Sequence, residues 1–148
     1  MGMKYVIGYI RVSAEKKEQE KKLKAQENIL INFCRINNME LLNIFYDEKT
    51  EENENFEKRT GLILAVDQIK IYEKSDTPVS YLIGENFDAF AEDKALLGYI
   101  QFQLARHNCS IFSINKENNN ILMDIGTTFA AYEKEMAKTI DILENKKN

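Results

Sequence analysis

The order of short apolar runs and amphipathic stretches most constrains the fold of this chain. Apolar runs of strand length alternate with segments whose apolar residues recur at helical spacing, as in helices that cover a sheet. The only proline, Pro78, marks a turn into one of the runs. The expected strands cover residues 5–11, 41–46, 79–83 and 109–114, and the expected helices cover residues 15–37, 60–72 and 93–106. This β-α-β-α-β-α-β order predicts an α/β fold, a mainly parallel sheet covered by helices in three layers.

A further apolar pattern at helical spacing runs over residues 121–145, after a polar stretch. A helix of that length is about 37 Å long, more than a small domain can cover. We therefore expect an α/β domain over residues 1–120 and a long C-terminal helix over residues 121–148 that pairs with another subunit. A final helix packed on the domain's own core is the alternative.

Composition limits the classes of function. At 148 residues and 44% hydrophobic, the chain can bury one core. It has no apolar run of about 18 residues and no signal sequence, so we expect a cytoplasmic protein that does not cross a membrane. Cys34 and Cys109 lack the spacing of a zinc or redox pair and are expected to be free, partly buried thiols. The single histidine, His107, is expected at a surface helix end.

One arginine and one serine stand two residues apart at the end of the first expected strand. Side chains at i and i+2 of a strand share a face, so Arg11 and Ser13 would lie together. A serine beside a fixed guanidinium suits attack on a phosphate, although Ser13 could instead cap the helix that follows it. Asp47 and Asp88 also come shortly after expected strands, and the carboxyl ends of parallel strands share one edge. Ser13, Asp47 and Asp88 could therefore share one cleft.

Charge is the main argument against a nucleic-acid partner. The net charge is −4, whereas phosphate binding usually needs a basic surface. Between residues 47 and 57 a single lysine stands among six acids, a pattern typical of a solvated loop. Net charge does not exclude a local site.

Five segments, in order, resemble the catalytic domain of the serine recombinases, the resolvase and invertase family. No single segment is specific, but their order and spacing are. The segments are Tyr9-Ile10-Arg11-Val12-Ser13, Leu23-Lys24-Ala25-Gln26, Tyr46-Asp47-Glu48, Arg59-Thr60-Gly61-Leu62 and Phe129-Ala130-Ala131-Tyr132-Glu133.

The resemblance implies a site-specific DNA recombinase that needs no cofactor or metal. In that family a serine attacks a DNA phosphodiester, leaving a 5'-phosphoserine bond and a free 3' hydroxyl, and subunits exchange in a tetramer before religation. The implied partners are DNA and further copies of the chain, in a homodimer or tetramer through the C-terminal helix. By position, the implied site residues are the nucleophile Ser13, the phosphate-binding Arg11 and Arg59, the glutamines Gln26 and (with a longer spacing) Gln19, and the carboxylates Asp47 and Asp88.

The chain departs from the family pattern after the third expected strand. The family has an Asp-Arg-x-x-Arg stretch there, whereas this chain reads Asp88-Ala89-Phe90-Ala91-Glu92. Losing one charge-stabilising donor typically lowers a rate by about 10² to 10³, so two missing guanidiniums predict weak cleavage. Lys94 or Arg106 could partly replace them. The DNA-binding module that follows the long helix in the family is also not expected in this chain.

Two other hypotheses are compatible with the sequence. One is a non-catalytic relative that keeps the fold as an interaction or regulatory module, which the missing arginines and the net acidity favour. The other is an unrelated parallel α/β enzyme or nucleotide binder, but no Gly-rich phosphate loop follows the first expected strand.

Overall fold

The computed structural model describes residues 3–13, 16–49 and 56–115. These residues form one parallel sheet with strand order β2-β1-β3-β4. The strands are β1 (Lys4–Ser13), β2 (Met39–Lys49), β3 (Val79–Gly84) and β4 (Ser110–Ser113). The helices are α1 (Lys16–Ile36), α2 (Thr60–Glu73) and α3 (Lys94–Ala105), with two short 3-10 turns, η2 (Phe56–Lys58) and η3 (Phe87–Ala89). The expected C-terminal helix lies outside the described residues.

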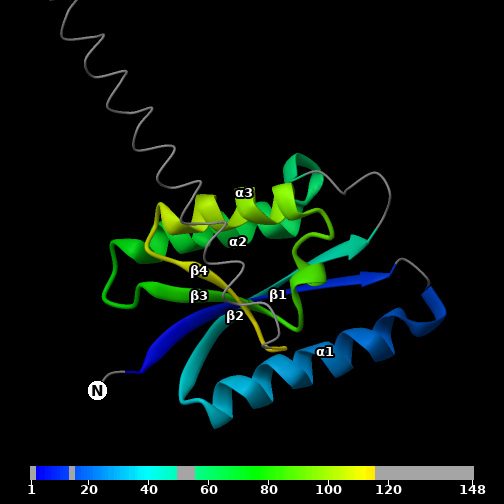
Figure 1. The fold of residues 1–148 in the computed structure, drawn as a ribbon. Helices are drawn as coiled ribbons and strands as arrows, with labels where there is room; N and C mark the ends of the chain where they lie inside the picture. Colours follow the sequence, from blue (N-terminus) through cyan, green and yellow to red (C-terminus); the bar gives the residue numbers. More distant parts are fainter. Residues whose placement is uncertain (1–2, 14–15, 50–55, 116–148) are drawn as a thin grey trace, which may run out of the picture.

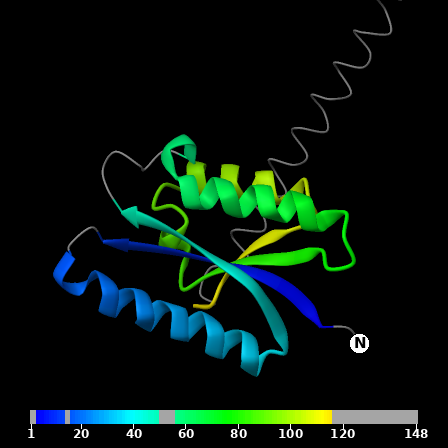
Figure 2. The same ribbon diagram turned by 180° about the vertical axis from the view of Figure 1, so that it is seen from behind.

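The helices cover the sheet from both sides. Helix α1 lies on one face, and α2 and α3 lie side by side on the other (Figure 1), as the view from behind also shows (Figure 2). This confirms the predicted α/β class with its parallel sheet between helix layers. The strand order reverses between β1 and β3, and open α/β sheets bind ligands at the carboxyl ends of strands next to such a reversal.

The central strand β1 contributes to the core on both faces. Ile7 and Tyr9 pack with α2 and α3, while Val6 and Ile10 pack with Leu30 of α1. All five side chains are buried. Because both faces are covered, β1 reads as a nearly continuous apolar run rather than as an alternating one.

The two strands that carry the expected site extend further than their apolar residues indicate. Strand β1 runs to Ser13 and β2 to Lys49, and the register pairs Arg11 with Asp47 and Ser13 with Lys49. Backbone pairing continues here because it does not depend on side-chain polarity. The expectation that Asp47 opens a solvated loop is therefore wrong, since Asp47 lies within β2.

The two cysteines are free as expected but are buried rather than partly buried, and the histidine lies at the helix end that the sequence indicates. Cys34 and Cys109 are free and buried. Burial raises the pKa of Cys34 to about 11 and that of Cys109 to about 12, which keeps both thiols protonated at neutral pH. His107 follows the end of α3, and its Nδ1 lies 2.6 Å from Oε2 of Glu73 on α2. Among the described helices, none combines the length and the apolar character needed to cross a bilayer.

Candidate active site

Two buried guanidiniums mark the carboxyl edge of the sheet. Arg11, near the end of β1, is 8% exposed, and Arg59, just before α2, is 1% exposed. An Nη1 hydrogen of Arg59 is donated to the carbonyl oxygen of Phe90. A buried guanidinium is stable only where acceptors or opposite charges surround it. The two positions that the resemblance assigns to phosphate binding are therefore built into the fold rather than left on its surface.

The carboxylate of Asp47 joins β1, β2 and α2. Its Oδ2 accepts a hydrogen bond from the Tyr9 hydroxyl at 2.7 Å and another from the Leu62 amide at 3.0 Å, and its Oδ1 accepts one from the Gly61 amide at 2.8 Å. The two amides belong to the first turn of α2, where backbone donors have no intrahelical acceptor and the helix dipole favours a negative charge. Residue 59, at the N-cap of α2, makes no such bond with its own side chain. Asp47 thus replaces the missing cap and fixes α2 against the strands.

The hydroxyl of Tyr9 is held in its neutral form by this arrangement. Burial and the hydrogen bond to Asp47 raise its pKa well above the ordinary value, while the charges of Arg59 and Arg11 oppose that rise in part. A folded-state pKa above the unfolded one contributes stability that is present below about pH 10 and is lost as the pH rises further.

In the Tyr9→Phe variant, the free energy of unfolding should therefore fall less steeply with rising pH than in the wild type. Between about pH 10 and pH 11 the wild type should lose up to about 1.4 kcal/mol more per pH unit than Tyr9→Phe. At pH 7 the variant should be less stable by about 1 kcal/mol, because the bond to Asp47 is gone. Urea unfolding at each pH measures both effects, with Tyr5→Phe as the control. If the free energy of unfolding of the wild type and of Tyr9→Phe fell equally with rising pH, Tyr9 would not have the raised pKa described here.

A lysine and a glutamate meet at the same edge. The ammonium of Lys49 forms a salt bridge with the carboxylate of Glu92, which follows η3. The pKa of Glu92 is lowered, first by the hydrogen bond and charge of Lys49 and then by the charges of Arg11 and Arg59. The charges of Lys49, Arg11 and Arg59 therefore all favour the ionised form of Glu92.

The segment that carries Glu92 is anchored by a buried aromatic ring. Phe90 is fully buried, its ring stacks on that of Tyr9 with centroids 5.9 Å apart, and its carbonyl receives the bond from Arg59. A Cβ on Gly84 would stand 2.8 Å from the Phe90 ring, so the last residue of β3 must be small. The stretch in which two arginines are missing is thus fixed beside Arg59.

The remaining expected site residues lie on β1, α1 and η3. Ser13 ends β1, where its backbone pairs with Lys49 of β2. Gln19 donates to Oε1 of Glu48 at 3.1 Å, Gln26 lies half-buried on α1, and Asp88 is exposed in η3. Gln19 and Asp47 both line a shallow cleft beside the end of β2.

The two proposed replacements for the missing arginines lie at opposite ends of α3. Lys94 is its first residue, two positions after Glu92, whereas Arg106 is its C-cap. A 12-residue helix is about 18 Å long, so Arg106 is at the far edge and cannot replace a guanidinium at the site. Sequence reasoning missed Lys49, which it counted only as the lone lysine of the acidic run. Its position two residues after Asp47 was the available signal.

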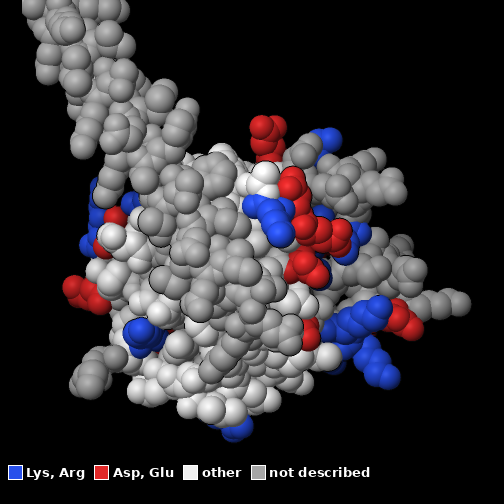
Figure 3. Space-filling model, viewed as in Figure 1, with Lys and Arg blue, Asp and Glu red and all other residues white. Residues whose placement is uncertain are grey.

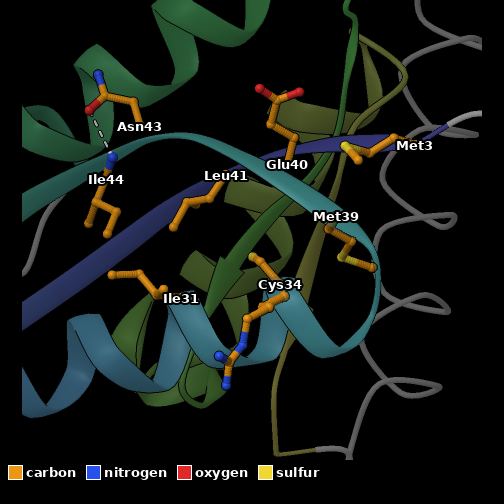
Figure 4. A pocket seen from close by; sticks show the side chains of 9 residues that line it. Met3, Ile31, Cys34, Met39, Glu40, Leu41, Asn43 and Ile44 are labelled. Atoms are coloured by element: carbon orange, nitrogen blue, oxygen red, sulfur yellow. Dashed lines mark hydrogen bonds between the residues drawn. The ribbon is translucent and has the colours of Figure 1, made fainter.

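The described side chains on the face drawn in Figure 3 form no continuous basic surface, and an apolar hollow of the structure lies away from the expected site. Where described side chains are visible in Figure 3, acidic and basic groups lie beside one another instead of forming one basic surface. A separate, mainly apolar hollow lies between α1 and the start of β2, lined by residues that include Ile31, Cys34 and Leu41 (Figure 4). It is at the opposite end of β2 from Asp47 and contains none of the expected site residues.

Comparison with known families decides the relationship. The model of the resolvase N-terminal domain matches residues 6–147 of this chain. The chain belongs to the resolvase family. A comparison with curated proteins finds no match.

Solved structures support the same fold for this resolvase-family chain. The C-terminal catalytic domain of ISC1926 TnpA, an IS607-like serine recombinase, is 15% identical, with 97% of this chain and 96% of that chain covered and a TM-score of 0.61. A resolvase family site-specific recombinase from Streptococcus pneumoniae is 16% identical, with coverages of 96% and 95% and a TM-score of 0.63. The N-terminal catalytic domain of TP901-1 integrase is 13% identical, with coverages of 90% and 98% and a TM-score of 0.62. At these identities the likeness concerns the fold.

Proposed function

We propose that this resolvase-family chain is a serine recombinase catalytic domain that cuts and rejoins DNA through Ser13. The observation that carries the proposal is the pair of buried guanidiniums, Arg11 and Arg59, at the edge where β1 ends. Phosphodiester cleavage passes through a pentavalent phosphorus with added negative charge, and preorganised arginines stabilise such charge by paired hydrogen bonds.

The proposed step exchanges one phosphate ester for another. The Ser13 oxygen forms a bond to phosphorus, the bond from phosphorus to the 3' oxygen breaks, and a proton equivalent to the one lost by the serine is taken up by the 3' oxygen, which leaves as a hydroxyl. Religation reverses the step, and because the bond energy is retained in the phosphoserine ester, no ATP is required. Arg11 and Arg59 would bind non-bridging oxygens, Asp47 would keep β2 and α2 in register, and Gln19, Gln26 and Asp88 would line the approach.

The proposed partners follow from this chemistry. DNA is the substrate, and recombination between two sites requires several copies of the chain, which we propose to associate as a homodimer or tetramer through residues 121–148. A DNA substrate is also consistent with a cytoplasmic protein. The mixed charge of the described side chains on the face drawn in Figure 3 favours contact with a few phosphates over binding along a long stretch of duplex.

A specific observation favours a second candidate, a non-catalytic relative that serves as an interaction or regulatory module. Ala89 and Glu92 occupy the positions of two family arginines, and the Glu92 carboxylate lies in the field of Arg11 and Arg59. A fixed negative charge there would oppose a phosphate.

Covalent capture separates the two candidates. The protein is incubated with a supercoiled plasmid that bears a candidate site, the reaction is stopped with denaturant, and protein bound covalently to DNA is isolated and digested to locate the modified residue. The recombinase proposal predicts DNA attached at Ser13 and complete loss of attachment in Ser13→Ala. The control Ser80→Ala, on β3, should attach DNA as the wild type does. Absence of any adduct, or an adduct that survives in Ser13→Ala, would overturn the proposal.

A further inference from the structure

A lysine that the family comparison does not single out stands directly beside the end of β1. Lys49 is the Cα partner of Ser13 in the parallel pairing of β1 and β2, two positions after the pair formed by Arg11 and Asp47. Paired residues of neighbouring parallel strands are about 4.8 Å apart across the sheet. Among the described lysines, this register position is the one next to the proposed nucleophile.

The position of the Lys49 ammonium is set by its partner. Glu92 receives it in a salt bridge, and Glu92 stands where the second arginine of the family stretch is expected. The backbone just before Glu92 is fixed, because Phe90 is fully buried and its carbonyl is bonded by Arg59. The ion pair therefore brings a cation from β2 to the place that a guanidinium would occupy from the loop after β3.

We propose that Lys49 is a further phosphate-binding residue of this site, which takes over the charge of a missing arginine, and that Glu92 is the anion that Lys49 releases when phosphate binds. The inference rests on the proposed function and deepens it, because it assigns the group that contacts the phosphate attacked by Ser13. The expected ligand is a phosphate diester, with one negative charge and two non-bridging oxygens.

To bind phosphate, the Lys49 ammonium must exchange the Glu92 carboxylate for the phosphate, and the exposure of both side chains allows this exchange. The Lys49 side chain is 50% exposed and that of Glu92 is 57% exposed. A solvated ion pair of this kind is weak, so an incoming phosphate can replace the carboxylate as the partner of the ammonium. With no phosphate bound, Glu92 pairs with the ammonium of Lys49 and keeps it at this edge of the sheet.

This arrangement predicts opposite effects for the two partners. Removing the ammonium should weaken phosphate binding, whereas removing the charge of Glu92 should strengthen it, because a competing anion is lost. Lysine acts as a point charge without the planar fork of arginine, so Lys49→Arg should bind at least as well as the wild type. A lysine with a purely structural role would not give this ordering.

The test measures binding of dimethyl phosphate, a diester with no nucleic-acid sequence, to the full-length protein by NMR titration. Relative to wild type, we expect Kd to rise about fivefold in Lys49→Ala and to fall about threefold in Glu92→Gln. Lys49→Arg should stay within about twofold or bind more tightly. The control Lys70→Ala makes the same charge change in the last turn of α2, away from the site, and should stay within about twofold.

Two results would overturn the inference: no binding of dimethyl phosphate by the wild type, or equal Kd values for Lys49→Ala and Lys70→Ala. Covalent capture of DNA, run in parallel, separates this inference from the proposed function. If the wild type attaches DNA and Lys49→Ala binds phosphate like the control, Lys49 has no such role while the recombinase proposal stands. If the expected order of Kd values holds and no DNA is attached, the phosphate site stands and the recombinase proposal falls.

Discussion

Restoring both arginines, with Ala89→Arg and Glu92→Arg in one variant, is expected to raise the rate of covalent DNA attachment by about 10² or more. Each charge-stabilising donor is typically worth about 10² to 10³ in rate, and Lys49 already supplies part of what is missing. Glu92→Arg also removes a carboxylate whose pKa responds to Arg11 and Arg59. The same substitutions should tighten dimethyl phosphate binding, which can be measured even where cleavage is slow.

The control for this variant carries the same change in net charge at another place. Asn28→Arg with Glu40→Arg alters two exposed positions, one on α1 and one at the start of β2. General attraction to DNA would raise attachment in both variants alike. Equal rates in the two variants, or no gain over wild type in either phosphate binding or attachment, would show that the segment 88–92 is not part of the site. Urea unfolding of each variant verifies that it remains folded.

Gly61→Ala is expected to lower the free energy of unfolding by about 3 kcal/mol or more, the largest effect on stability in this set. A Cβ at Gly61 would stand 2.8 Å from the carbonyl carbon of Tyr46 and 3.0 Å from Oδ1 of Asp47, and closer still to the Tyr46 oxygen. Backbone atoms cannot move aside as a flexible side chain can. The start of α2 would shift away from β2, which would break the bonds from the Gly61 and Leu62 amides to Asp47.

Chemical denaturation compares this variant with Thr60→Ala. Thr60 is the preceding residue and is exposed, so its substitution should change stability by less than about 0.5 kcal/mol. A loss below about 1 kcal/mol in Gly61→Ala would mean that α2 and β2 tolerate a larger separation than the contacts indicate. The prediction also explains the glycine in the Arg59-Thr60-Gly61-Leu62 segment: without a side chain, Gly61 allows α2 to begin in direct contact with β2.

The sequence predicts the sheet and helices of the described part because burial governs them. Apolar periodicity identifies α2 and α3 to within two residues at each end, and Pro78 correctly marks the start of β3 at Val79. Periodicity fails at the carboxyl ends of β1 and β2, where polar residues continue the strands through backbone pairing. Asp47 and Lys49 lie at the end of β2, so the hydrophobic pattern ends that strand before it reaches the site.

The sequence indicates which side chains belong to the candidate site better than it indicates which contacts each of them makes. Arg59 is expected as a phosphate ligand, yet its burial and its bond to Phe90 also make it part of the core. Asp47 is expected as a carboxylate of the site, and its three hydrogen bonds to Tyr9, Gly61 and Leu62 depend on contacts between distant segments. A single sequence gives no information about such contacts, whereas residue type and order do indicate which end of the sheet is functional.

The bonds from Asp47 to the first turn of α2 have a consequence for observing the site. The amides of Gly61 and Leu62 exchange with solvent only when they leave that carboxylate, so their hydrogen-exchange rates report directly on opening between α2 and β2. First-turn amides of a helix without such a partner exchange quickly. The exchange rates at these two positions would therefore measure how often α2 separates from β2 at this edge of the sheet, and the measurement needs neither DNA nor catalysis.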